Sequence, residues 1–596
     1  MIGVAIDEEL GENMQPQTVL KEKFGYDQFR QGQSEVIESV LAGDNVLAIM
    51  PTGGGKSLCY QIPALILPGL TLVISPLISL MKDQVDALNE NGIAATFINS
   101  TLDYFEVQER LNQAAQGAVK LLYVSPERLD SEQFLSDLAG LKIDLIAIDE
   151  AHCISQWGHD FRPSYLRLTD TIQRVQSQPT IIALTATATS QVATDIMQRL
   201  SIQREVKTGF SRENLAFQVV KNQNSDRYLL DYLKVNRQKA GIIYASTRKE
   251  VERLTKLIEK AKLPVAMYHG GLNEMVRRQN QEDFLYDRKP IMVATNAFGM
   301  GIDKSNVRFV VHAQIPGSLE AYYQEAGRAG RDGLPSEAIL LFRQNDVQIQ
   351  HFFIDQSEMD EEHKQREYAK LQEMTQYAST QQCLQQYIVN YFDDHCEPCG
   401  RCSNCLDTRE EQDITIEAQK VLSCVKRMDQ RFGKVLVAQV LTGSKNQKIM
   451  QFRFDELPTY GLLRGDSQKE VSGLIDYLVA SGFLQPSSGQ FPVLQLTAEG
   501  VAVLKGQTAV TRKMAVKVQK TLPEDNELFE RLRELRRDLA EEQGVPPFVI
   551  FSDKTLYSMC ELMPTSLTEM LDVKGVGESK LEKYGDLFLD VLNEAV

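Results

Sequence analysis

The sequence lacks a long uninterrupted apolar run. Its most apolar segments, such as LTLVISPLISL, contain serine and proline, and none reaches the roughly 20 apolar residues that a membrane-spanning helix needs. The N-terminus, MIGVAIDEELGENMQPQ, is acidic and has no basic start followed by an apolar core, so it does not match a secretion signal. We therefore expect a cytoplasmic protein without a membrane segment.

Tryptophan is scarce, and the 64 basic residues are outnumbered by 81 acidic ones. The 596 residues contain one tryptophan, and their formal net charge is −17. An acidic total argues against a protein that coats a polyanion, but nucleic acid stays open because binding needs only a local basic groove. Hydrophobic residues make up 43% and charged residues 24% of the chain, which is typical of globular domains, and the length allows several of them.

The cysteines do not have the distribution of a disulfide framework. Of nine cysteines, five fall within one short segment: Cys383, Cys396, Cys399, Cys402 and Cys405. In a chain without an export signal, such clustering favours a metal site. Four thiolates, from Cys383, Cys399, Cys402 and Cys405, would complete a tetrahedral structural Zn²⁺ site. An iron–sulfur cluster is the main alternative, and Cys396 or His395 could compete as a ligand.

A glycine-rich turn follows a short apolar run in VLAIMPTGGGKSLCY, residues 46–60. Glycines let backbone N–H groups converge on phosphate oxygens, and the next helix adds its N-terminal dipole. Thr52, Gly53, Gly55, Lys56 and Ser57 are therefore predicted to bind a nucleotide, with Lys56 on phosphate and Ser57 on Mg²⁺. The alternative is a glycine-rich turn that arose by chance.

Two carboxylates follow the predicted buried strand LIAI in LIAIDEAH, residues 145–152. Ligands of open α/β sheets bind beyond the carboxyl ends of the strands. There Asp149 could hold Mg²⁺, and Glu150 could polarise the water that attacks a γ-phosphate. An exposed acidic loop is the alternative for such a pair alone.

Residues 24–37, FGYDQFRQGQSEVI, precede the glycine-rich turn and contain Tyr26, Arg30 and Gln33. A glutamine amide can pair with N6 and N7 of adenine, and Tyr26 could stack on the base. We expect all three near the nucleotide. The alternative is that they are ordinary polar residues of the surface.

A second α/β segment has strand-like runs but no phosphate-binding loop of its own. It contains YYQEAGRAGRDG, residues 322–333, in which Arg328 and Arg331 are three residues apart. An arginine presented across a cleft stabilises charge on a transferring phosphoryl group. Two arginines in a solvated turn are the alternative.

The only tryptophan lies in DEAHCISQWGHDFRPSYLRL, residues 149–168. Glycine and proline make this segment a loop that carries aromatic rings and positive charge next to the acid pair. Trp157 could instead be a core residue that anchors the loop.

Seven motifs together resemble superfamily 2 helicases, and more specifically the RecQ family: TGGGKS, SPLISLMKDQV, DEAH, QWGHDFRPSY, LTATAT, ATNAFGMGIDK and QEAGRAGRDG. The loop after DEAH is the discriminating motif, because DEAH also occurs in RNA helicases. The resemblance extends from residue 19 over nearly the whole chain. EPCGRCSNC and the cysteine ahead of it also match the family's zinc pattern.

The resemblance implies a multidomain fold of two α/β RecA-like lobes, a helical zinc-binding module, a winged helix and a small all-α HRDC bundle. The expected parts are a tail (1–18), an ATP-binding lobe (19–210), a C-terminal lobe (211–345), a zinc module (346–410), a winged helix (411–510), a linker (511–524) and an HRDC domain (525–596).

The resemblance also implies ATP, Mg²⁺ and structural Zn²⁺ as cofactors. It assigns catalysis to Lys56, Asp149, Glu150, Arg328 and Arg331, and adds Gly301 and Asp303 to the nucleotide site. It makes the loop after DEAH a sensor of single-stranded DNA, through His152, Trp157, His159, Phe161 and Arg162, because aromatic rings stack on bases.

The predicted function is an ATP-dependent 3′-to-5′ DNA helicase acting in recombination, repair and the SOS response. Its expected partners are single-stranded and duplex or branched DNA, with single-strand-binding protein and other repair proteins as candidates. We expect a monomer in the nucleoid of a bacterial cytoplasm. The alternatives are an RNA helicase or ribonucleoprotein remodeller, and a DNA-binding regulator without ATPase activity.

Overall fold

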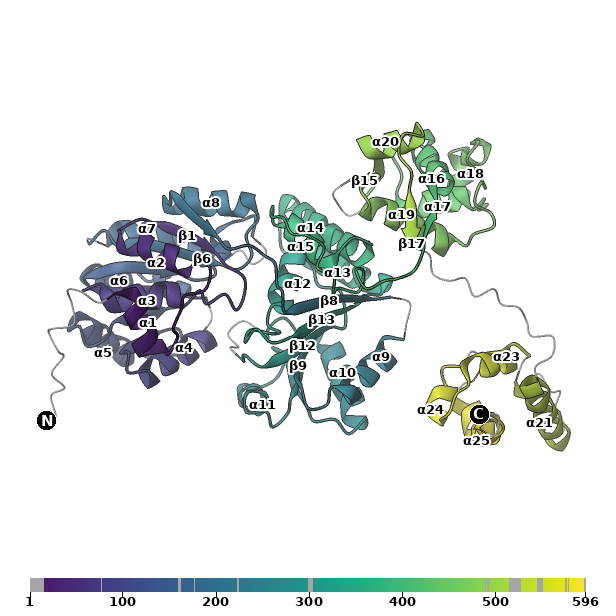
Figure 1. The fold of residues 1–596 in the computed structure, drawn as a ribbon, viewed down its shortest axis with the longest axis horizontal. Coiled ribbons are helices and arrows are strands. Elements are labelled where there is room, and N and C mark those ends of the chain that lie inside the picture. The colour runs from purple at the N-terminus through teal and green to yellow at the C-terminus, as the bar shows by residue number, and fades with distance from the viewer. Residues whose placement is uncertain are drawn as a thin grey trace. The chain divides into compact units, whose positions relative to one another are not determined.

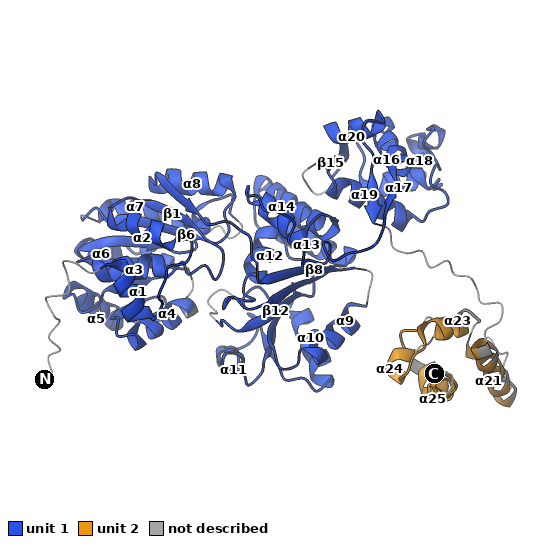
Figure 2. Ribbon diagram, viewed as in Figure 1, with its two compact units in different colours: residues 1–514 blue, residues 515–596 orange. Residues whose placement is uncertain are grey.

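The computed structural model describes residues 15–76, 78–158, 162–175, 177–221, 224–298, 304–487, 489, 492–513, 527–543, 550–551, 553–573, 576 and 578–593. The chain divides into two compact units, residues 1–514 and 515–596 (Figure 2). The first unit contains two separate parallel sheets (Figure 1).

The first sheet has seven strands in the order β3-β4-β2-β5-β6-β1-β7, and all neighbours are parallel. Its strands are β1 (Val46–Ile49), β2 (Leu70–Ile74), β3 (Ala95–Ile98), β4 (Leu121–Val124), β5 (Ile143–Ile148), β6 (Thr180–Thr185) and β7 (Arg204–Lys207). Its helices are α1 (Pro16–Phe24), α2 (Gln33–Leu41), α3 (Leu58–Ile66), α4 (Ile78–Glu90), α5 (Tyr104–Ala115), α6 (Glu132–Ala139), α7 (Leu168–Arg174) and α8 (Ser190–Leu200). Because β5, β6 and β1 are adjacent, the loops at their carboxyl ends meet.

Both faces of this sheet are buried. Along β1, Leu47 and Ile49 belong to one apolar cluster, whereas Val46 and Ala48 belong to another. Alternate side chains of a strand point to opposite faces, so helices cover the sheet on both sides. This explains why its strands are continuously apolar rather than alternating.

The second sheet has six parallel strands in the order β10-β11-β9-β12-β13-β8. They are β8 (Leu215–Val220), β9 (Ala240–Tyr244), β10 (Val265–Tyr268), β11 (Ile291–Ala294), β12 (Val307–His312) and β13 (Ser336–Leu341). Its helices are α9 (Ser225–Val235), α10 (Arg248–Lys260), α11 (Glu274–Leu285) and α12 (Leu319–Ala326). The two sheets confirm the predicted pair of α/β lobes.

The rest of the first unit is mainly helical. A three-helix segment follows the second sheet: α13 (Gln344–Gln356), α14 (Glu361–Ser379) and α15 (Leu384–Tyr391). The next segment has a core of its own. Its helices are α16 (Thr415–Arg427), α17 (Lys434–Leu441), α18 (Gln447–Gln451), α19 (Gln468–Ala480) and α20 (Ala498–Leu504). Its short strands are β14 (Glu411–Asp413), β15 (Leu484–Pro486), β16 (Leu494–Leu496) and β17 (Thr511–Lys513). Helices with the β15–β16 hairpin agree with the expected winged helix.

The second unit is helical in its described residues. It contains α21 (Glu527–Gln543), α23 (Asp553–Leu562), α24 (Leu567–Met570) and α25 (Glu578–Asn593). Phe551 and Phe588 pack edge to face in its core, with ring centroids 4.9 Å apart. The small all-α bundle is therefore confirmed. Across the described parts of both units, no helix combines the length and apolarity that spanning a bilayer requires.

Candidate active site and metal centre

The glycine-rich turn connects β1 to the N-terminus of α3, as predicted. Gly53 and Gly55 have φ angles of 82° and 81°, which side chains with a Cβ rarely adopt. The Lys56 ammonium donates to the Met50 carbonyl at 3.2 Å, so it lies inside the turn. Backbone N–H groups, a helix N-terminus and a lysine thus meet at one point, which suits phosphate.

The segment before β1 packs on this turn. The Gln33 side chain is buried, and its amide donates to the Gly55 carbonyl at 2.9 Å and accepts from the Arg30 N–H at 2.8 Å. Arg30 also donates to the Gly53 carbonyl. Tyr26 is 54% exposed, which leaves its ring available to a base. Contact of Gln33 with adenine stays a prediction, because the observed bonds hold the turn.

The acid pair lies at the end of β5, two strands away from β1. The Ser75 hydroxyl is 3.5 Å from a carboxylate oxygen of Asp149, and Glu150 begins the next turn with a left-handed φ of 48°. Burial and the Glu150 carboxylate raise the pKa of Asp149 to about 7, and Lys56 opposes this rise. A divalent cation beside Asp149 would favour its ionised form, so the site fits Mg²⁺.

His152 connects the acid pair to β6, the strand between β5 and β1. It is buried, and its Nδ1 lies 3.0 Å from the Thr185 hydroxyl and 3.4 Å from a Glu150 oxygen. The Thr185 hydroxyl also accepts from the Thr187 N–H at 3.2 Å. The motif LTATAT marked this strand end, but the sequence did not show that Thr185 meets His152.

The loop after the acid pair is held by α14. The guanidinium of Arg366 lies 4.4 Å from the centre of the Trp157 ring, and it donates to the Gln156 carbonyl at 3.2 Å. Lys370 donates to the Gly158 carbonyl at 3.1 Å. Trp157 is 39% exposed, so it is not the fully buried core residue of the alternative interpretation.

Of the remaining predicted loop residues, the structure describes Arg162. Arg162 lies 3.4 Å from the Pro76 carbonyl, on the ATP-binding lobe itself. His159 and Phe161 lie outside the described residues, as do Gly301 and Asp303 of the second lobe. Their predicted roles stay predictions.

The two arginines of the second lobe follow α12. Arg328 is buried. The Cα of Arg331 lies 3.4 Å from the position that a Cβ on Gly53 would occupy, so the arginine turn is packed against the phosphate-binding turn. Burial lowers the pKa of Lys56, the Glu150 and Asp149 carboxylates oppose this, and the charge of Arg331 adds to it. Lysine, acid pair and arginine therefore lie within electrostatic reach of one another.

No sequence motif pointed to Arg212, which lies in the segment between the two sheets. It is 8% exposed, and its guanidinium donates to the Thr52 carbonyl at 2.8 Å and to the Ala329 carbonyl at 3.1 Å. Only the tertiary fold brings these segments together.

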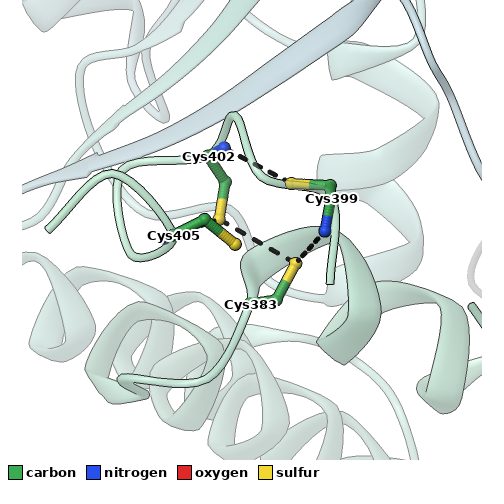
Figure 3. Close-up of side chains that lie close together, drawn as sticks. All are labelled: Cys383, Cys399, Cys402 and Cys405. Atoms are coloured by element: carbon green, nitrogen blue, oxygen red, sulfur yellow. Dashed lines mark hydrogen bonds between the residues drawn. The ribbon is translucent and has the colours of Figure 1, made fainter. Parts of the chain in front are cut away.

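Four cysteines form a compact cluster after α14 (Figure 3). The sulfurs of Cys383, Cys399, Cys402 and Cys405 all lie within 4.8 Å of one another. Tetrahedral Zn²⁺ with bonds of about 2.3 Å would place its sulfurs about 3.8 Å apart, and the Cys383 and Cys402 sulfurs are 3.9 Å apart. The cluster therefore fits zinc.

Backbone N–H groups point at these sulfurs. Those of Cys399, Leu384 and Cys405 lie 3.2–3.4 Å from the sulfurs of Cys383 and Cys402. Such donors stabilise thiolates, as a metal site requires. Cys396 and His395 are outside the group of four among the described residues.

Comparison with known families assigns five segments of the chain. Residues 30–196 match the DEAD/DEAH box helicase family, and residues 224–333 match the helicase conserved C-terminal domain. Residues 344–406 match the RecQ zinc-binding family, 408–521 the RQC domain and 525–592 the HRDC domain.

Full-length relatives extend this result. The chain is 54% identical to the ATP-dependent DNA helicase RecQ of Bacillus subtilis (strain 168), over 96% of this chain and 97% of that protein. It is 42% identical to the protein of the same name from Haemophilus influenzae, over 97% of this chain and 95% of that one. The DNA helicase interpretation, with ATP, Mg²⁺ and structural zinc, is thereby confirmed over its alternatives. The chain belongs to the RecQ family of ATP-dependent DNA helicases.

Proposed function

We propose that Lys56, Asp149, Glu150 and Arg331 form one ATP-hydrolysing centre shared by the two lobes. The observation that carries this proposal is the packing of Arg331 against Gly53 in the turn that holds Lys56, with the acid pair at the end of β5 in the same sheet as β1. When bound, Mg²⁺ neutralises phosphate charge. Lys56 binds phosphate, Ser57 and Asp149 hold the metal, and Glu150 orients the attacking water.

Arg331 stabilises the charge that develops on the γ-phosphoryl group, with Arg328 beside it. Arg331 packs on Gly53 although it belongs to the other lobe. Closure of the lobes therefore brings its charge to the phosphates. Tyr26, Arg30 and Gln33 shape the base side of the same site, with Thr52, Gly53 and Gly55 on the phosphate side.

The loop after DEAH couples single-stranded DNA to hydrolysis in this proposal. Trp157 and Phe161 stack on bases, and Arg162 supports the loop from the same lobe. His152 supports the loop, because its ring contacts both the Glu150 carboxylate and the Thr185 hydroxyl at the end of β6. A base that reorders the loop can thereby change the position of the water-orienting carboxylate.

The enzyme moves 3′-to-5′ on single-stranded DNA and unwinds duplex or branched DNA in recombination, repair and the SOS response. We propose a monomer in a bacterial cytoplasm, associated with the nucleoid and in contact with single-strand-binding protein and other repair proteins. The domain boundaries predicted above stay part of this proposal.

The test is ATP hydrolysis with and without single-stranded DNA, for wild type and Trp157→Ala. DNA should raise the wild-type rate strongly, and the variant should keep only a basal rate. If the variant responds to DNA like wild type, Trp157 is a packing residue. Duplexes with a single-stranded overhang at either end test polarity: only the 3′ overhang should support unwinding, and single-stranded RNA should not replace DNA.

A further inference from the structure

A buried arginine joins the phosphate-binding turn to the arginine turn of the other lobe. Arg212 lies in the segment between β7 and β8, and it is 8% exposed. One nitrogen of its guanidinium donates to the Thr52 carbonyl at 2.8 Å and to the Gly327 carbonyl at 3.3 Å. The other donates to the carbonyls of Ala329 at 3.1 Å and Gly330 at 3.3 Å.

Through these bonds, Arg212 contacts one turn on each lobe. Thr52 begins the phosphate-binding turn, whereas residues 327–330 carry Arg328 and lead directly to Arg331. Among the described residues, the four hydrogen-bond partners of its guanidinium are backbone carbonyls, so its donors are used within the protein rather than directed at a phosphate. A planar guanidinium can hold several carbonyls at fixed angles, which a lysine ammonium cannot do.

The zinc module bonds the backbone of Arg212 and the side chain of the residue before it. Arg401, between the cluster cysteines Cys399 and Cys402, donates to the Arg212 carbonyl at 2.9 Å. Gln385, at the start of α15, donates to the Ser211 hydroxyl at 2.7 Å.

The residues before Arg212 are also fixed by this module. The ring of Phe210 stacks on Phe392, with centroids 4.3 Å apart, and the Phe210 N–H donates to an Asp394 oxygen at 3.2 Å. Lys207 donates to the Phe392 carbonyl at 2.8 Å. The backbone that presents Arg212 is therefore part of the zinc module's packing.

We propose that Arg212 is a positioning residue for ATP hydrolysis, and that the zinc module sets its place through Arg401. We call the contacts of Arg212 with Thr52 and residues 327–330 the interlobe bracket. The bracket fixes the distance from the arginine turn to the phosphates, so it acts on the transition state through Arg331. This inference rests on the proposed role of Arg331.

The test measures kcat and KM for ATP at saturating single-stranded DNA. Arg212→Met keeps the length of the side chain but removes its donors. Because a misplacement of about 1 Å can cost about 100-fold in rate, we expect kcat to fall about 10- to 100-fold. The KM for ATP should stay near the wild-type value, because Arg212 bonds the backbone carbonyls of Thr52 and residues 327–330 and is given no contact of its own with the nucleotide in this proposal. A KM that rises while kcat is kept would overturn the proposal, as would an unchanged kcat.

Arg401→Met tests the contribution of the zinc module. It removes one bond to the Arg212 backbone, so kcat should fall less than in Arg212→Met. The double variant should be no worse than Arg212→Met alone, because both changes act through one contact. Additive losses, or no loss in Arg401→Met, would overturn the link to the zinc module. Zinc content and melting temperature are measured for every variant, and a loss of kcat that simply follows either one counts against positioning.

Two further variants separate this inference from the proposed function. Arg331→Ala should lose most of its kcat; if it does not, the proposed centre fails whatever Arg212 does. If Arg331→Ala loses kcat and Arg212→Met does not, only the bracket fails. Arg174→Met is the matched control, because Arg174 pairs with Glu132 on the surface of the first lobe, and it should behave like wild type.

Discussion

Replacing Arg366 should make the DNA-coupling loop easier for single-stranded DNA to engage. The α14 latch, defined as the contacts of Arg366 and Lys370 with residues 156–158, covers one face of the Trp157 ring. A base cannot stack on a ring face that a guanidinium occupies. If DNA stacks on that face, binding must break the contact with Arg366, and Arg366→Met removes that requirement.

The size of the effect follows from the contacts that are lost. The Arg366 side chain is 17% exposed, so its cation–π contact is partly shielded from water and contributes about 1 kcal/mol. The hydrogen bond to the Gln156 carbonyl adds about 1 kcal/mol. A total of about 2 kcal/mol corresponds to a shift of about 30-fold in the half-saturating DNA concentration.

The only tryptophan of the chain makes the assay direct. Intrinsic tryptophan fluorescence reports on Trp157 alone, and a titration with a short single-stranded oligonucleotide gives the half-saturating concentration. Arg366→Lys keeps the charge but loses the planar stack, so its value should fall between the wild type and Arg366→Met. Lys364→Met is the control for loss of a positive charge on α14, because the Lys364 ammonium bonds the Asp355 carbonyl and not the loop.

Two results would refute this reasoning. If the emission of Trp157 without DNA is the same in wild type and Arg366→Met, the guanidinium does not hold the ring. If Arg366→Met needs more DNA than wild type while Lys364→Met does not, Arg366 contributes to the DNA-bound state instead of opposing it.

Three other perturbations have defined outcomes. Lys56→Ala should abolish ATP turnover but keep most of the affinity for single-stranded DNA, measured by Trp157 fluorescence; an equal collapse of affinity would show that the two sites are not separate. Cys402→Ser should lose bound zinc, measured by metal analysis, and lower the melting temperature, because a fully buried ligand of the cluster is replaced; retention of zinc would contradict the four-thiolate site. Gly241→Ala should destabilise the second lobe by about 1–3 kcal/mol, because its Cβ would lie 2.0 Å from the Phe309 ring on the neighbouring strand; an unchanged unfolding transition in calorimetry would contradict this packing.

The chemistry of the site was predictable wherever it depends on a local pattern. Glycines, Lys56 and the following helix are contiguous in the sequence, and the cysteine spacing is a pattern of the same kind. The apolar strand before Asp149 indicated a buried parallel sheet, which places that carboxylate at the edge where ligands bind. Such features need no knowledge of distant residues.

The contacts that connect the parts were not predictable in this way. Arg212 is 160 residues from Thr52 and 189 from Arg401, and no periodicity relates these positions. Arg366 is likewise 210 residues from Gln156. From the sequence, an arginine in a polar segment is expected to be a solvated side chain. Its partners here are backbone carbonyls, and because every residue has one, no residue type indicates them. For Gln33 the position was predicted but the partner was not. Its side chain bonds the phosphate-binding turn, whereas the sequence had suggested contact with adenine.

The two long-range contacts of the zinc module suggest why a helicase needs a structural metal. One end of the module reaches Arg212 through Arg401, and α14 reaches Trp157 through Arg366. The Leu384 N–H bonds to the Cys402 sulfur, so the cluster ties the start of α15 to the loop that carries Arg401. A module fixed in this way can transmit a change at the DNA-coupling loop to the interlobe bracket as a movement of one body. Loosening the cluster should therefore weaken the stimulation of ATP hydrolysis by DNA before it weakens DNA binding itself. Partial zinc removal by a chelator, followed by both measurements on the same sample, checks this order; DNA affinity that falls first would mean that the module serves binding and not coupling.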